Sequence, residues 1–133
     1  MAIQIDNTNT GTITLRPPAS GTQSITLSTT SFNRYMQIIA VDSGTALSNG
    51  TNIIGQVEIP VAGTITSIRA KTSSGTCTVT FNINASSIGS VAATTSGVSS
   101  AISSAVSAND DLTLDVSSAS GSGLLVVLTI EGS

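Results

Sequence analysis

Short runs in which Ile, Val or Leu alternates with Ser or Thr recur along the whole chain. Such runs stand at residues 11–15, 24–28, 77–84 and 112–116. A period of two places one set of side chains on a buried face of a β-strand and the other set in water. Turn signals separate these runs by roughly 8–12 residues, as in all-β sandwiches. The pattern predicts an all-β protein with one β-sandwich domain that is jelly-roll-like in its number of strands.

The placing of the individual strands follows from Gly, Pro, Ser and Asn clusters. The segment 92–109 fits two interpretations, because Val98, Ile102, Ala105 and Val106 have helical spacing although Ser, Thr and Gly are poor helix formers. We favour strand and loop over one short helix there. The expected strands are 32–41, 53–60, 64–72, 77–84, 112–116 and 124–130, and the expected connections include 42–52, 73–76 and 117–123.

The first 31 residues differ from the rest in having few large apolar side chains. Prolines at positions 17 and 18 interrupt this region, and a proline cannot donate to a β-ladder. We therefore divide the chain into an extended N-terminal arm, residues 1–31, and a β-sandwich domain, residues 32–133. An extended arm can add strands to the sheet edge of a neighbouring protein. The candidate partner-binding residues are the arm's apolar residues Ile3, Ile5, Ile13 and Leu15.

Charge and hydropathy argue against two classes of partner. Only 8% of the 133 residues are charged, the net charge is −3, and Lys and Arg together number four. Nucleic-acid binding needs a basic stripe or aromatic stacking platforms, and the sequence has one Tyr, two Phe and no Trp. The N-terminus has no signal-peptide pattern, and the apolar run 124–128 is far too short to span a bilayer. We expect neither a nucleic-acid nor a membrane partner.

Catalytic residue types are scarce. The sequence has no His, one Lys (Lys71) and one Cys (Cys77), so a Ser or Cys nucleophile has no evident base. Cys77 alternates with Val79 and Phe81 and is interpreted as a buried apolar residue. The acidic cluster at residues 109–111 fits a turn better than a calcium site, because its spacing is not that of an EF-hand. We expect a non-enzymatic protein without a cofactor or a metal.

Three stretches of the sequence carry a resemblance. The segment 11–27 is similar to a part of tailed-bacteriophage virion proteins in which a strand, a Pro-Ala-Ser-Gly turn and a second strand follow one another. The segments 57–89 and 111–131 resemble β-sandwich domains of phage structural proteins. Together these stretches cover most of the chain.

The resemblance implies a structural role in a virion, with synthesis in the host cytoplasm. A capsid decoration (cement) protein, a homotrimer that binds the major capsid protein, is the preferred role. A small tail or head fibre or spike subunit that contacts the host is the second. A carbohydrate-binding module on the same scaffold is a third, since a fold does not determine a function.

Overall fold

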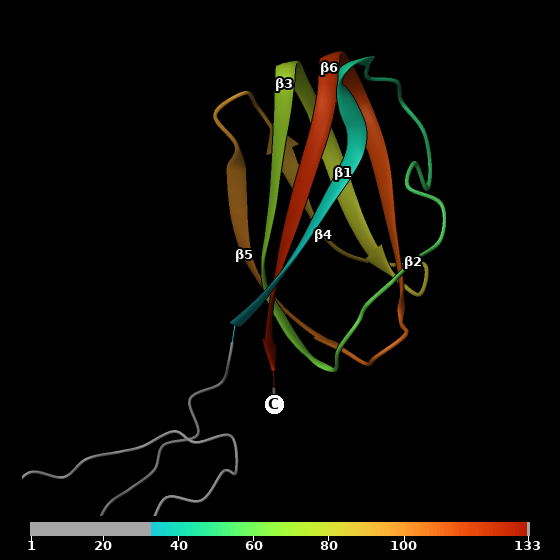
Figure 1. Cartoon of the computed structure of the whole chain (residues 1–133), viewed down its shortest axis with the longest axis vertical. Coiled ribbons are helices and arrows are strands. Elements are labelled where there is room, and N and C mark those ends of the chain that lie inside the picture. Colours follow the sequence, from blue (N-terminus) through green and yellow to red (C-terminus); the bar gives the residue numbers. More distant parts are fainter. Residues whose placement is uncertain (1–32, 133) are drawn as a thin grey trace, which may run out of the picture. The chain divides into compact units, whose positions relative to one another are not determined.

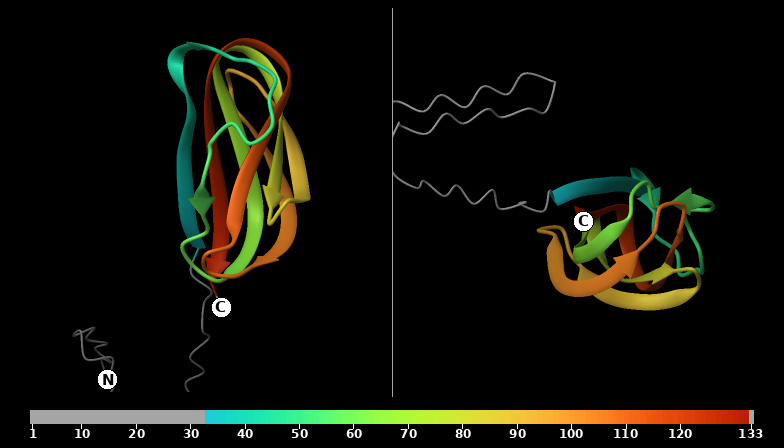
Figure 2. Two further views of the ribbon diagram at one scale, coloured as in Figure 1. Left: turned by 90° about the vertical axis from the view of Figure 1, so that its right-hand side faces the viewer. Right: turned by 90° about the horizontal axis from the view of Figure 1, so that it is seen from below.

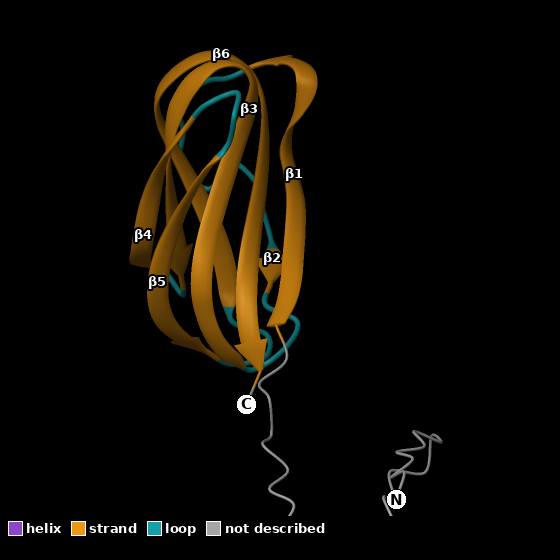
Figure 3. Ribbon diagram, turned by 90° about the vertical axis from the view of Figure 1, so that its left-hand side faces the viewer, coloured by secondary structure: helices purple, strands orange, loops and turns teal. Residues whose placement is uncertain are grey.

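The computed structural model describes residues 33–132, and every regular element in that range is a β-strand. Figure 3 shows these strands joined by loops, of which the one between β1 and β2 is long. Because the strands pair antiparallel throughout, the predicted all-β class is confirmed. The strands are β1 (Asn33–Ala46), β2 (Val57–Glu58), β3 (Gly63–Ile83), β4 (Ser86–Ala93), β5 (Val98–Val106) and β6 (Asp111–Gly132).

Strands β3 and β6 form a long two-stranded ribbon on which the other strands are arranged. They pair from Gly63 opposite Gly132 to Ile83 opposite Leu112. Both strands turn over together at one end of the molecule and run back (Figures 1 and 2). Within the ribbon Gly75 lies opposite Gly121, with φ values of 66° and 91°. Glycine tolerates such positive φ, so the ribbon can bend here without losing its pairing.

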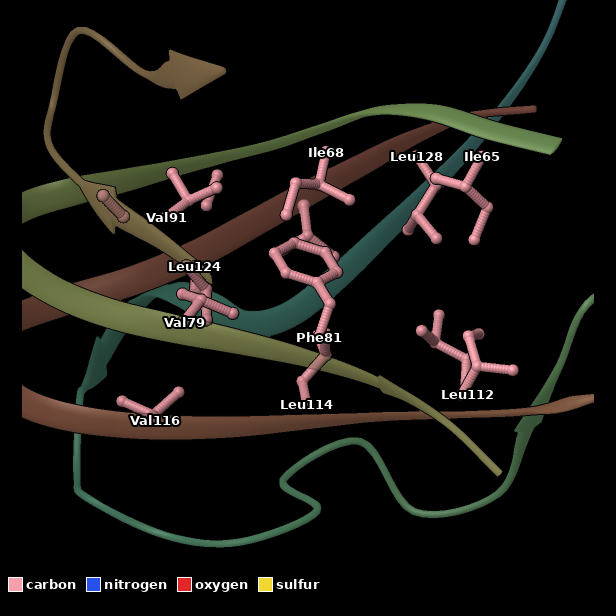
Figure 4. Close-up of a cluster of buried hydrophobic side chains, with 14 of the residues drawn as sticks. Ile65, Ile68, Val79, Phe81, Val91, Leu112, Leu114, Val116, Leu124 and Leu128 are labelled. Atoms are coloured by element: carbon pink, nitrogen blue, oxygen red, sulfur yellow. The ribbon is translucent and has the colours of Figure 1, made fainter. Parts of the chain in front are cut away.

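Each half of the ribbon has its own neighbours. In one half, β5 pairs with the beginning of β3, and β1 pairs with the end of β6. In the other half, β4 pairs with the end of β3, and β2 pairs with the beginning of β6. The two halves enclose the apolar core between them, and Figure 4 shows the Phe81 ring of one half below Ile68 of the other.

The core is built from medium-sized aliphatic side chains around one aromatic ring. Phe81 is fully buried, and so are the alternating residues Leu112 and Leu114 of β6. A β-bulge between Ile65 and Ser67 inserts one residue into β3, and it allows Ile65 and Ile68 to be buried together although they are three residues apart. Alternation thus places the core side chains, and the bulge corrects the phase where the sequence alternation breaks.

The structure differs from the expected strand boundaries at the two bends. Residues 73–76 and 117–123 were predicted as connections, but they lie inside β3 and β6 and pair with each other across the ribbon. These predictions are wrong because Gly and Ser mark a sharp bend of a paired ribbon as readily as they mark a reversal of the chain. Two expected hairpin partners are therefore two halves of one strand.

Two further boundaries need correction. Strand β1 continues to Ala46, five residues into the connection that was expected to begin at residue 42. The expected strand 53–60 is reduced to Val57–Glu58, because the positive φ of Gly55, 71°, interrupts it. The preceding segment still runs along β6, with the Ile53 backbone nitrogen donating to the Leu114 carbonyl at 2.9 Å.

The segment 92–109 contains the end of β4 and all of β5, so the strand-and-loop interpretation is confirmed. Within the described part of the chain there is no helix, and hence none long and apolar enough to cross a membrane. The expected arm, residues 1–31, lies outside the described residues, as do the predicted partner-binding residues Ile3, Ile5, Ile13 and Leu15.

Candidate functional site

The acidic cluster forms a turn. The Asp110 carboxylate accepts hydrogen bonds from the Ser107 backbone nitrogen at 2.8 Å and from Asn84 Nδ2 at 2.9 Å. These bonds, the one from Ser107 first, lower the pKa of Asp110 because they stabilise its charged form. The turn interpretation is confirmed, with Asn109 at a φ of 69°. In residues 33–132 no three Asp, Glu, Cys or His side chains gather where they could hold a metal ion.

Asp115 connects β6 to two other parts of the chain through hydrogen bonds. Its two carboxylate oxygens accept from the Asn52 backbone nitrogen at 2.8 Å and from Asn82 Nδ2 at 3.0 Å. These contacts fix the loop before β2 to the outer side of β6. A groove of about 520 Å³ lies over this point, lined by Asn49, Gly50, Thr51, Thr80, Asp115, Val116 and Ser117.

Cys77 is buried in the core, as predicted, on the same face of β3 as Val79 and Phe81. Burial raises the pKa of its thiol because the charged thiolate loses hydration. A thiol with a raised pKa is a poor nucleophile at neutral pH. Cys77 therefore belongs to the packing of the core.

The most distinctive surface lies on the outside of β1. Tyr35 and Ile39 are 71% and 67% exposed, and they are the large hydrophobic residues that stand out as exposed in the described range. They point to the same side of β1, away from the half-buried Met36 and Ile38. Single exposed apolar residues are common on proteins, but two on one strand face form the beginning of a patch.

Pairing extends this patch across two more strands. Ile39 lies opposite Leu125 of β6, and Leu125 lies opposite Lys71 of β3. The neighbouring row runs in the same way from Gln37 through Val127 to Arg69. We call this surface the outer β1 face, and it consists of Tyr35, Gln37, Ile39, Leu125, Val127, Arg69 and Lys71.

The two basic residues of the outer β1 face differ in their surroundings. Arg69 donates from Nη1 to Ser99 Oγ and from Nη2 to the Ser96 carbonyl, both at 3.3 Å. The exposed Lys71 has no acidic side chain paired with it in the described range. One cation is thus held against the protein, and the other is available to a partner.

A shallow groove of about 780 Å³ opens beside Lys71 on this face. Ile39, Val41 and Leu125 provide its apolar lining, while Lys71 and Asp42 provide charges of opposite sign. An apolar floor with a few charges at its rim is a typical protein-docking surface.

The outer β1 face was not predicted from the sequence. The partner-binding residues that were predicted lie in the arm, outside the described range, so the structure does not test them. The available signal was that both faces of the segment 36–41 are partly apolar, which a strand with one face in water does not require. Comparisons of the chain with protein-family models, curated proteins and solved structures returned no match.

Proposed function

We propose that this chain is a non-enzymatic virion structural protein, a capsid decoration protein that binds the outside of a bacteriophage head through its outer β1 face. The observation that supports this proposal most is the pair of exposed residues Tyr35 and Ile39, which lie on the same face of the sheet as Leu125 and Val127 of β6. The resemblance of the sequence to phage structural proteins supplies the kind of assembly.

The outer β1 face suits attachment to a large protein surface better than it suits catalysis. An aromatic and aliphatic centre supplies apolar area, and Lys71 supplies a donor that can meet acidic groups of the shell. A decoration protein is present in many copies on one particle, so a modest affinity for each copy is enough. We infer that the shell surface beneath it is apolar and acidic.

The folded ribbon also supports the finer fold assignment in the proposal. Two facing halves, each with its own edge strands, correspond to a β-sandwich in which one long antiparallel ribbon is folded over. A jelly roll is built on the same principle of a folded antiparallel ribbon. A β-sandwich is suited to binding flat against the surface of a particle.

A second candidate function rests on the groove over Asp115. Its lining of hydroxyl and amide groups, with a carboxylate held in place by two hydrogen bonds, could bind a neutral glycan. That activity would suit a fibre or spike subunit or a carbohydrate-binding module. Binding on a glycan array that is lost in Thr80→Ala but kept in Ile39→Asp would favour this candidate over decoration.

The decoration proposal is tested by sedimentation with empty capsids of the phage whose genome encodes this chain. Wild-type chain should pellet with the capsids to saturation. Ile39→Asp should lose most of the binding, because it puts an uncompensated charge into the apolar centre. Ala92→Asp is the matched control, since Ala92 is an exposed β4 residue in the other half of the ribbon. Equal binding by both variants, or none by the wild type, contradicts the proposal.

A further inference from the structure

Strand β1 is an edge strand, and its regular part before the bulge at Ile39 lacks the usual protection. It pairs with β6 on one side, and within residues 33–132 no strand pairs with its other side. An edge strand presents unpaired N–H and C=O groups, and proteins normally guard such edges with charges, prolines or short length. The stretch from Tyr35 to Val41 has no charged residue and no proline, and β1 is 14 residues long.

The charges at the two ends of this stretch have opposite signs. Arg34 precedes it and Asp42 follows it, and both side chains are exposed. Neither side chain has a hydrogen bond or an ion pair within the described part of the chain. A strand that is positive at its beginning and negative at its end is complementary to an antiparallel copy of itself.

We propose that the free edge of β1 pairs antiparallel with β1 of a second copy of this chain across a two-fold axis. A two-fold interface brings the same surface of both copies together, so strand pairing across it is necessarily antiparallel. The regular stretch ends at the bulge between Ile39 and Val41, which leaves Tyr35 to Ile39 for the ladder. A two-fold axis at Gln37, the middle of that stretch, places Tyr35 opposite Ile39 of the second copy.

In this register the exposed side chains of β1 contact side chains of the second copy. Tyr35 packs beside Ile39 of the second copy twice, and an aromatic residue beside a β-branched one is a favourable cross-strand pair. This axis places Arg34 of each strand opposite residue 40 of the other, two positions before Asp42, so charges of opposite sign lie near each other just beyond both ends of the ladder. The backbone groups of the edge gain partners, and the two sheets become continuous.

The pairing also places two outer β1 faces side by side, since Leu125 and Val127 continue the face on each copy. Two linked faces can bind one surface more tightly than two separate chains. The inference itself rests on the edge strand and its charges and does not require the proposed function. It predicts a dimer, whereas the resemblance to phage proteins led to the expectation of a trimer.

Analytical ultracentrifugation of the full chain tests the proposal through a charge exchange. Wild-type chain should have twice the 13.2 kDa chain mass at micromolar concentration. Arg34→Asp and Asp42→Arg should each weaken the dimer by about tenfold, because they bring like charges near each other at both ends of the ladder. The double variant should recover the wild-type dissociation constant. Glu58→Arg, which changes an exposed charge on β2, should have no effect.

The double variant makes the test specific, because loss of folding or of a local contact would not be repaired by a second charge reversal. Gln37→Cys provides a second readout. The two introduced thiols should form a disulfide across the two-fold axis under copper-catalysed oxidation by oxygen, whereas Ala92→Cys should not. A monomer or trimer mass for the wild type, or no recovery in the double variant, overturns the proposal. Capsid binding by a monomeric chain would overturn it while leaving the decoration function in place.

Discussion

Replacing Gly121 with Ala tests the bend of the β3–β6 ribbon. Gly121 has a φ of 91°, and a β-carbon added to it would overlap the Ser74 carbonyl of the facing strand. A positive φ costs an L-residue about 1–2 kcal/mol. Forcing an additional carbon into a filled space costs about 1–3 kcal/mol more. We therefore expect Gly121→Ala to lower the free energy of unfolding by about 2–5 kcal/mol.

Two other glycines separate the contributions to this cost. Gly55 has a φ of 71° and open space around its α-carbon, so Gly55→Ala should show the conformational cost alone, about 1–2 kcal/mol. Gly44 has open space and no strained φ, so Gly44→Ala should change stability by less than about 0.5 kcal/mol. The difference between the Gly121 and Gly55 variants then measures the close approach of the two strands.

Urea unfolding followed by circular dichroism gives the required free energies. Because Gly75 faces Gly121, a double-mutant cycle on these two positions should be strongly non-additive. If Gly121→Ala costs no more than Gly55→Ala, the two strands do not cross closely at this point. The folded ribbon would then be refuted at its bend.

Two further predictions concern the end of the ribbon near Asn84. Ala85 has a φ of 66° in the turn between β3 and β4, directly after Asn84 with a φ of 48°. Because glycine adopts a positive φ without strain, Ala85→Gly should raise the free energy of unfolding by about 1 kcal/mol in the same urea assay. A loss of stability would contradict the turn geometry. The hydrogen bonds to the Asp110 carboxylate lower its pKa in the folded state. The stability that they add is therefore present above the ordinary pKa of an aspartate and is lost as the pH falls through the folded-state pKa. The stability difference between wild type and Asp110→Asn should accordingly shrink on acidification in urea titrations at several pH values, and a difference that grows would show that the pKa is raised.

The strands that could be predicted from the sequence are those with an unbroken alternation. The runs from Cys77 to Ile83 and from Leu112 to Val116 bury the residues expected of them, because burial of alternate side chains is a local property of a strand. The bends at Gly75 and Gly121 could not be predicted. Their role depends on a partner more than 40 positions away, and a local run of Ser and Gly is the same in a turn and in a bent ribbon.

The outer β1 face could not be predicted from the sequence, for a related reason. The apolar character of Ile39 and Leu125 is plain in the sequence, but their adjacency arises from the pairing of β1 with β6. Lys71 joins them only because β3 lies on the other side of β6. The fold class follows from periodicity, whereas the docking surface follows from strand order, which periodicity does not contain.

Hydroxyl-radical footprinting of the chain, free and bound to empty capsids, is the most direct test of the outer β1 face as the docking surface. The side chains of Tyr35 and Ile39 should lose reactivity when capsids are added at constant chain concentration. Those of Val57 and Ile88, which belong to the other half of the ribbon, should keep theirs. Protection of Val57 and Ile88 with unchanged reactivity of Tyr35 and Ile39 would contradict the account.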